Sequence, residues 1–245
     1  MLEVTGLTKS FGALRASDGI DFDVREGETH AVIGPNGAGK TTFIGQLAGN
    51  LRPDAGRIVF AGEDITALSA PRRARKGLAR SFQITSIYKE FTALENVALA
   101  VQACGGHSFR LWRPAFRDRA LLAPAGTILE EVGLGERQDV VAANLSHGEQ
   151  RQLEVAMALA TRPRLLLLDE PMAGMGAEES QRMIAFLASL KQRHSIILVE
   201  HDMDAVFRLA DRISVLVYGR VVATDTPQNI RSNEDVRRAY LGEDA

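Results

Sequence analysis

The sequence has a single cysteine and no long apolar segment, and each absence excludes a class of protein. With Cys104 alone, the 245-residue chain cannot form an intramolecular disulfide framework, which fits a reducing compartment. No stretch approaches the roughly eighteen consecutive apolar residues that a membrane-spanning helix needs. The first twenty residues include Glu3, Lys9, Arg15 and Asp18 and lack the apolar run of a secretory signal. We therefore expect a cytoplasmic globular protein that acts at a membrane only through partners.

The chain also lacks an excess of charge of either sign. It has 29 Lys and Arg against 31 Asp and Glu, a formal net charge of -2, so its overall charge does not point to nucleic acid or anionic lipid. Basic and aromatic residues do alternate over residues 109–119, as they do in some nucleic-acid-binding surfaces. Because the total charge is near zero, we interpret this stretch as a solvated face or a surface for a protein partner. The basic residues of 72–76 predict a polar helix that ends at Gly77.

Hydrophobic residues make up 45% of the chain, enough for a core, and the first third reads as short strands. Residues 20–24 alternate apolar and charged side chains, the period of a half-buried antiparallel strand. Residues 29–33 form a short apolar-leaning run that stops at Gly34, and residues 57–60 lie between two turn-forming segments. These segments predict a β-rich N-terminal region.

Helical signals dominate the middle of the sequence. Thr92 and Glu95 have the spacing of a capping box and precede residues with a helical apolar face. Pro124 and Gly126 then punctuate a helix-rich stretch that runs to about Leu145.

From Leu165 onward, buried strands alternate with helices. The aliphatic run 165–168 and the strand-like run 195–199 flank a segment with a helical apolar face. This alternation predicts a mainly parallel sheet with covering helices. We therefore predict one α/β core, residues 1–87 and 156–245, interrupted by a helical insert, residues 88–155.

A glycine-rich segment after residues 29–33 carries the clearest chemical signal. Its pattern, G-x-x-x-x-G-K-[ST], is that of a phosphate-binding loop, in which backbone amides wrap an anion and a helix begins with its positive end toward the phosphates. The eight positions are Gly34, Pro35, Asn36, Gly37, Ala38, Gly39, Lys40 and Thr41. We expect Lys40 to reach the β- and γ-phosphates, the Thr41 hydroxyl to ligate Mg²⁺, and Thr42 to extend the cradle.

Two carboxylates follow the aliphatic run 165–168, at the place where a buried strand would end. Open α/β sheets bind their ligands beyond the carboxyl ends of the strands. We expect Asp169 to hold the Mg²⁺ shell, and Glu170, which points the other way, to orient or deprotonate an attacking water. An aliphatic run that ends in Asp-Glu is common by itself, but together with the phosphate loop it predicts nucleotide hydrolysis.

With three further stretches, these motifs resemble the nucleotide-binding subunit of ABC transporters over essentially the whole chain. Residues 145–150, Leu-Ser-His-Gly-Glu-Gln, resemble the family signature LSGGQ. Gln83 stands where the family has a glutamine that touches Mg²⁺ and the lytic water, and His201 looks like the switch histidine that contacts the γ-phosphate. Phe11 occupies the position of the aromatic residue that stacks on adenine.

The resemblance implies a fold, two ligands and a dimer. The fold is α/β, a P-loop NTPase (RecA-like) core with an N-terminal antiparallel β subdomain and an inserted α-helical subdomain. ATP and Mg²⁺ are the implied ligands. The residues implied in catalysis or metal binding are Thr41, Gln83, Asp169, Glu170 and His201. Ser146 and Gly148 would meet the γ-phosphate bound by the other protomer of a head-to-tail dimer.

The sequence departs from the family pattern at three positions. His147 replaces the first glycine of the signature, and Glu149 replaces its glutamine. Glu149 and Ser146 also have capping-box spacing, so we expect the Glu149 carboxylate to fold back onto Ser146. Gly176 stands in the loop where many relatives have an aspartate, and it cannot supply that carboxylate.

Within the family, three segments resemble ATPase subunits of branched-chain amino acid uptake systems: residues 173–175, 200–203 and 235–242. The last, taken by itself, is a short docking helix without substrate information. We expect an importer subunit for branched-chain amino acids or related small polar solutes, peripheral on the inner face of the cell membrane. Its implied partners are separate permease subunits, a second cassette that is identical or paralogous, and, indirectly, a solute-binding protein.

Two alternatives belong to other classes. A soluble ABC-type ATPase that acts on nucleic acid or ribosomes would have a long coiled coil, a second cassette or a basic surface, none of which the sequence shows. A GTPase or small-molecule kinase would leave the Ser146 and His201 stretches unexplained, and the chain has no Asn-Lys-x-Asp guanine-reading motif.

Overall fold

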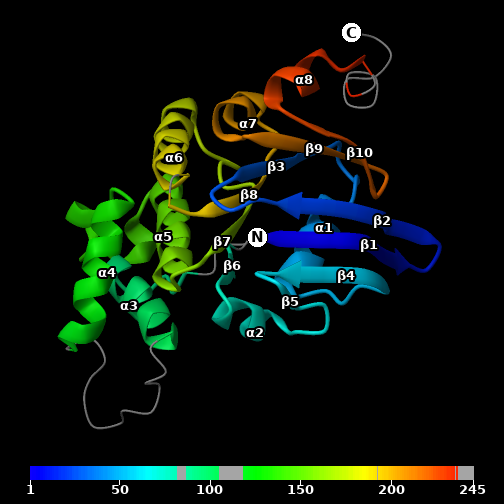
Figure 1. Ribbon diagram of the computed structural model, residues 1–245. Coiled ribbons are helices and arrows are strands. Elements are labelled where there is room, and N and C mark those ends of the chain that lie inside the picture. Colours follow the sequence, from blue (N-terminus) through cyan, green and yellow to red (C-terminus); the bar gives the residue numbers. More distant parts are fainter. Residues whose placement is uncertain (82–86, 105–117, 192, 235, 237–245) are drawn as a thin grey trace.

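The computed structural model describes residues 1–81, 87–104, 118–191, 193–234 and 236, and in this part of the chain two β-sheets lie next to each other (Figure 1). The first sheet is antiparallel and has four strands, which confirms the β-rich N-terminal region. Its strands, in spatial order, are β2 (Leu14–Val24), β1 (Leu2–Phe11), β4 (Ala55–Phe60) and β5 (Glu63–Asp64).

The second sheet has six strands and is mainly parallel, as the alternation of strands and helices predicts. Within the described residues, the edge pair β9–β10 is its only antiparallel pair. Its strands, in spatial order, are β10 (Arg220–Asp225), β9 (Arg212–Val217), β3 (Thr29–Ile33), β8 (Ser195–Val199), β7 (Leu165–Asp169) and β6 (Leu78–Arg80).

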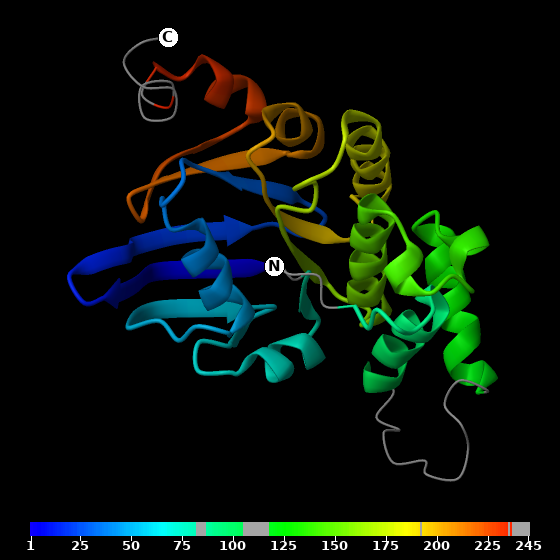
Figure 2. The ribbon, with the colours of Figure 1, turned by 180° about the vertical axis from the view of Figure 1, so that it is seen from behind.

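Helices cover both faces of the six-stranded sheet. The α-helices are α1 (Lys40–Ala48), α2 (Ala70–Arg75), α3 (Ala93–Cys104), α4 (Arg119–Glu131), α5 (His147–Ala160), α6 (Ala177–Leu190), α7 (Met203–Leu209) and α8 (Pro227–Ser232), with 3-10 turns at Gly135–Arg137 and Ala142–Asn144. Helices α3, α4 and α5 gather at one end of the molecule (Figure 2). This end contains the predicted helical insert.

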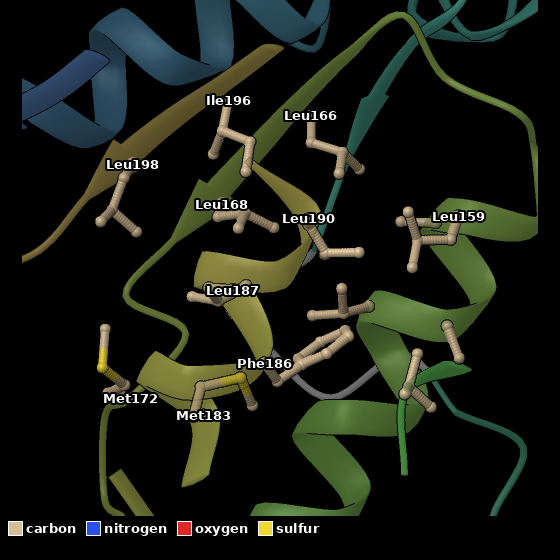
Figure 3. Packing of buried hydrophobic residues seen from close by; sticks show 14 of the residues in the cluster. Leu159, Leu166, Leu168, Met172, Met183, Phe186, Leu187, Leu190, Ile196 and Leu198 are labelled. Atoms are coloured by element: carbon tan, nitrogen blue, oxygen red, sulfur yellow. The ribbon is translucent and has the colours of Figure 1, made fainter. Parts of the chain in front are cut away.

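The central strands are buried on both faces, which explains their continuous apolar sequence. In β7, Leu165 and Leu167 pack with α1 and the antiparallel sheet. Leu166 and Leu168 point to the opposite face and meet α6, whose Leu187 lies nearby (Figure 3). Because successive side chains of a strand alternate in direction, one strand joins two separate cores. Helix α1, which begins at the phosphate loop, is therefore held between the two sheets.

The helical insert begins with the predicted capping box. The Thr92 hydroxyl accepts a hydrogen bond from the Glu95 amide at 3.1 Å, and the Glu95 carboxylate accepts one from the Thr92 amide at 2.8 Å. Pro124, however, lies inside α4 and does not interrupt it. An internal proline costs a helix about 3 kcal/mol. Burial of Ala125 and Leu129, on the turn that follows, offsets this cost.

The prediction of a polar helix over residues 72–76 is wrong for Arg73. Helix α2 ends before Gly77, as expected, but the Arg73 side chain is fully buried. Its guanidinium donates hydrogen bonds to the carbonyl oxygens of Gln46 and Leu47, both at 2.7 Å. These carbonyls belong to the last turn of α1, where the regular helical hydrogen bonds end, and the Gln46 carbonyl also accepts one from the Gly49 amide at 3.3 Å. Arg73 thus caps the carboxyl end of the helix that starts at the phosphate loop.

Candidate nucleotide site

The predicted chemical groups meet where three parallel strands end. β3, β8 and β7 are neighbours in the six-stranded sheet, and their carboxyl ends lie at the same edge. Gly34 follows β3, Asp169 ends β7, and His201 comes two residues after β8. The strand order thus brings together groups that are far apart in the sequence.

The phosphate loop is enclosed so closely that two of its positions admit only glycine. A Cβ atom on Gly34 would lie 2.1 Å from the carbonyl oxygen of Leu216, and one on Gly39 would lie 2.2 Å from that of Ala16. Gly39 has a φ of 103° and stands directly before α1. The Ala38 carbonyl also accepts a hydrogen bond from the Gly219 amide at 2.8 Å. Both sheets therefore fix the backbone of this loop.

Lys40 is the first residue of α1, and its ammonium group turns back into the loop. Its Nζ donates hydrogen bonds to the carbonyl oxygens of Gly34 at 2.5 Å and Pro35 at 3.0 Å. Burial lowers the pKa of Lys40, and the negative charges of Glu170 and Asp169 act in the opposite direction. The positively charged Lys40 ammonium group is thus bound to carbonyl oxygens of the loop itself. The solvent-exposed members of the loop and of the first helical turn are Asn36, Gly37 and Thr41, while Thr42 is half-buried.

Asp169 and Glu170 differ sharply in their surroundings. The Asp169 side chain is 1% exposed and forms an ion pair of 2.8 Å with Arg80 Nη2. Glu170 leaves the strand with a φ of 49°, and its side chain is 28% exposed. Glu170 Oε1 lies 3.9 Å from Nδ1 of His201, whose side chain is largely exposed. Of the two adjacent carboxylates, that of Asp169 is therefore buried and that of Glu170 is accessible to solvent.

Glu200 also belongs to this region, although the sequence alone does not indicate a role for it. Its buried carboxylate accepts hydrogen bonds from the backbone amides of Met172 at 2.9 Å and His201 at 3.1 Å. Burial raises the pKa of Glu200, and these amide hydrogen bonds oppose the shift. Glu200 thus joins the loop after Glu170 to the loop that carries His201. The signal in the sequence is a carboxylate directly after the aliphatic run 196–199, the arrangement that drew attention to Asp169.

The signature segment forms the capped beginning of α5. The Ser146 hydroxyl accepts a hydrogen bond from the Glu149 amide at 3.2 Å, and the Glu149 carboxylate accepts one from the Ser146 amide at 2.8 Å. Arg137 also donates to this carboxylate at 2.9 Å. Although partial burial acts to raise it, these hydrogen bonds keep the pKa of Glu149 below its usual value. The predicted folding of Glu149 onto Ser146 is confirmed.

The two residues after Ser146 are in contact with a neighbouring loop and helix. The exposed His147 ring lies over Gly174, where an added Cβ would come within 3.1 Å of His147 Nε2. A Cβ on Gly148 would meet the Glu179 carboxyl group at 3.0 Å. The signature therefore packs on the segment that follows Glu170 in the same chain. Gly176 stands just before α6, and its amide donates to Glu179 at 3.4 Å.

The remaining predicted residues are not all assembled with the phosphate loop. None of the hydrogen bonds or ion pairs among the described residues joins Ser146 or Gly148 to that loop. Phe11 ends β1, is 50% exposed, and has Lys9 Nζ 5.7 Å from its ring centroid. Gln83 lies outside the described residues.

Comparisons with known proteins agree with this geometry. A family model described as "ABC transporter" matches residues 17–173, and one described as "Branched-chain amino acid ATP-binding cassette transporter" matches residues 220–245. The chain is 43% identical to the high-affinity branched-chain amino acid transport ATP-binding protein BraF of Pseudomonas aeruginosa, with 99% of this chain and 98% of that protein covered. It is 39% identical, at the same coverage, to the corresponding protein LivG of Escherichia coli K12.

Solved structures give the same result. The ADP conformation of MJ1267, an ATP-binding cassette of an ABC transporter, matches with a TM-score of 0.88 and 31% identity and covers 99% of both chains. The predicted fold, a P-loop NTPase core with an antiparallel β subdomain, is confirmed. The chain belongs to the ABC transporter family as one of its ATP-binding cassettes, which hydrolyse ATP to drive transport.

Proposed function

We propose that this cassette uses Mg-ATP to drive the uptake of branched-chain amino acids or related small polar solutes through separate membrane subunits. The solute class is supported by the match at residues 220–245 and by the similarity to BraF and LivG, which are named as branched-chain amino acid transport proteins. The observation that carries the ATPase chemistry is the meeting of Lys40, Asp169, Glu170 and His201 at the ends of three neighbouring strands. The alternative of an ATPase that acts on nucleic acid or ribosomes is not favoured, because these relatives are transport subunits.

The residues at the sheet edge are suited to magnesium bound together with a nucleotide. Among the described residues, no group of three or more His, Cys, Asp and Glu side chains could hold a metal ion by itself. Mg²⁺ is commonly bound by one or two protein groups together with substrate phosphates. In our proposal Thr41, Gln83 and Asp169 would hold the ion, which would supply positive charge to neutralise the phosphates. The phosphate loop and Lys40 bind the phosphates, and Phe11 stacks on adenine.

The different burial of Asp169 and Glu170 at the end of β7 suggests which of them takes part in hydrolysis. The accessible Glu170 carboxylate orients a water molecule and accepts its proton as the water attacks the γ-phosphate. His201, 3.9 Å from Glu170, contacts the same phosphate. Gln83 completes the catalytic set. The bond between the γ-phosphorus and the oxygen that bridges it to the β-phosphate breaks, so inorganic phosphate leaves and ADP remains in the loop.

The position of the signature supports a dimer in which each cassette completes the site of the other. Ser146 is exposed at the amino end of a 14-residue helix, where backbone amides and the helix dipole favour an anion. It makes no hydrogen bond to the phosphate loop of its own chain within the described residues. We propose that Ser146 and Gly148 face the γ-phosphate held by a second cassette, identical or paralogous.

A cavity between the α/β core and the helical insert supports the proposal of a membrane-embedded partner. It has a volume of about 390 Å³ and is lined mainly by small apolar residues of α2, α3, α5 and β6. In the described part of the chain, no helix is long and apolar enough to cross a membrane. We propose that a segment of a permease subunit docks in this cavity. Co-purification with the permease subunits and uptake of labelled leucine by the reconstituted complex test the solute.

Replacement of Glu170 tests the catalytic assignment. Because Glu170→Gln removes the proton acceptor and leaves the phosphate loop intact, we expect ATP hydrolysis to fall by about 100-fold or more with nucleotide affinity retained. Steady-state ATPase assays and calorimetry with ADP measure the two effects. Glu178→Gln changes an exposed carboxylate on α6 and should preserve both. Undiminished hydrolysis by Glu170→Gln would refute the assignment.

A further inference from the structure

Asp169 has a partner that the sequence analysis did not foresee. Arg80, the last residue of β6, places Nη2 2.8 Å from Asp169 Oδ2 across 89 positions of sequence. Both groups are withdrawn from solvent, with side-chain exposures of 13% for Arg80 and 1% for Asp169. The pair lies at the edge of the nucleotide site, since Asp169 ends the strand from which Glu170 continues.

The surroundings make Arg80 the counter-ion of this carboxylate. A buried carboxylate without an opposite charge is costly, and removal of one partner of a buried pair destabilises proteins strongly. Lys40, the other nearby cation, directs its hydrogen bonds to Gly34 and Pro35. Among the described residues, Arg80 is the one that forms an ion pair with Asp169.

Within the described part of the chain, the Arg80 guanidinium itself forms few hydrogen bonds. Arg80 Nε is buried and has no hydrogen-bond partner among the described residues. Arg80 also lines the mainly apolar cavity, and the hydrogen bond that its side chain forms among the described residues is the one to Asp169. The guanidinium is thus held mainly by Asp169.

We propose that Arg80 neutralises Asp169 while the site lacks a metal ion and thereby sets how tightly the site binds magnesium. This inference rests on the proposed role of Asp169 as a magnesium ligand. A metal ion bound to Asp169 would lie close to the Arg80 guanidinium, which is already paired with that carboxylate. Both groups are positively charged, so they would repel each other at such a short distance. Arg80 therefore stabilises the metal-free cassette and weakens its affinity for the metal.

The test compares ADP affinity in EDTA with ADP affinity in excess Mg²⁺, measured by calorimetry on the full chain. The ratio of the two dissociation constants reports the contribution of magnesium. In Arg80→Met this ratio should rise by about tenfold, because a repulsive charge has been removed beside the metal. Arg80→Lys keeps the charge, so its ratio should remain near that of the natural chain. An unchanged or smaller ratio in Arg80→Met would overturn the proposal.

Thermal unfolding in EDTA provides the second readout. Arg80→Met should melt at a lower temperature than the natural chain, and Arg80→Met combined with Asp169→Asn should recover most of the loss, because neither charge then remains. Arg151→Met breaks another buried ion pair, that with Glu154, and should lower stability without changing the magnesium ratio. A double variant no more stable than Arg80→Met would contradict the pairing. A natural chain that binds no ADP would instead contradict the proposed function.

Discussion

His30 shows at the scale of one residue how the strand before the phosphate loop is fixed. It lies fully buried on β3, where Nδ1 is 2.8 Å from the Asp23 carbonyl oxygen and Nε2 is 2.8 Å from the Ser214 hydroxyl. Burial, helped by the nearby Arg212 guanidinium, lowers the pKa of His30 to about 4, although Glu28 and Asp23 act against the shift. The histidine therefore stays neutral in the folded protein at neutral pH.

This shift predicts a loss of stability in weak acid. The folded-state pKa of about 4 lies below the ordinary 6.5, so the unfolded chain binds the proton first. As the pH falls from 7.5 to 5, the free energy of unfolding should decrease by about 2 kcal/mol through this group. Urea denaturation at a series of pH values measures the decrease. His30→Asn should flatten the curve between these limits, and an unchanged slope would show that other groups cause it.

Single residues also show what sequence can and cannot reveal about the site. The capping box of Ser146 and Glu149 is predictable because its partners are three positions apart and their geometry is local. The pair of Arg80 and Asp169 is not, because it depends on β6 and β7 being neighbours, and a three-residue strand such as β6 has almost no periodic signal. Glu200 could have been noticed from its place after an apolar strand.

At the scale of secondary-structure elements, α1 depends on a side chain from another helix. Its amino end faces the phosphate loop, and its carboxyl end is capped by Arg73 from α2. Arg73 also donates to the carbonyl oxygens of Leu68 and Thr66, both at 2.9 Å. Burial lowers its pKa to about 10, which leaves the guanidinium charged at neutral pH. One arginine thus joins α1, α2 and the segment between β5 and α2.

Removal of this arginine should loosen the helix that carries Lys40. Arg73→Met removes the hydrogen bonds that the guanidinium donates to four carbonyl oxygens, so we expect a loss of about 2–4 kcal/mol in the free energy of unfolding. Arg72→Met, on the exposed side of the same helix, should change stability little. Guanidinium denaturation compares the two variants. Equal stability would mean that water replaces the lost hydrogen bonds at no cost.

Strands and helices were predictable from the sequence where their hydrophobic pattern is strong. The runs 165–168 and 195–199 are strands because both faces of the sheet are covered, and a continuous aliphatic run is typical of that environment. The burial of Arg73 could not be predicted, since a basic run normally lies on a solvated face and its partners are 26 and 27 positions away. The continuity of α4 through Pro124 likewise depends on tertiary packing.

At the scale of the whole molecule, the phosphate loop and the signature are separate surfaces of one chain. The loop lies between the two sheets, while Ser146 lies at the start of α5, within the helical insert. The contact of His147 with Gly174 and that of Gly148 with Glu179 hold the signature against the segment after Glu170. A second cassette placed on the signature would therefore also meet the end of β7. This arrangement would link closure of the proposed dimer to the position of Glu170, the proposed catalytic carboxylate.

A bulky charge at the signature should consequently prevent dimer formation without damage to the nucleotide site of the same chain. In a Glu170→Gln background, which retains ATP, we expect Ser146→Arg to remain monomeric in ATP and Mg²⁺ while it binds ADP with near-normal affinity. Analytical ultracentrifugation and calorimetry measure these two properties. Thr127→Arg adds the same side chain at an exposed position of α4 and should still dimerise. If Ser146→Arg dimerises as well as its parent, the signature does not face the second cassette, and the ATP molecules must be bound by each chain alone.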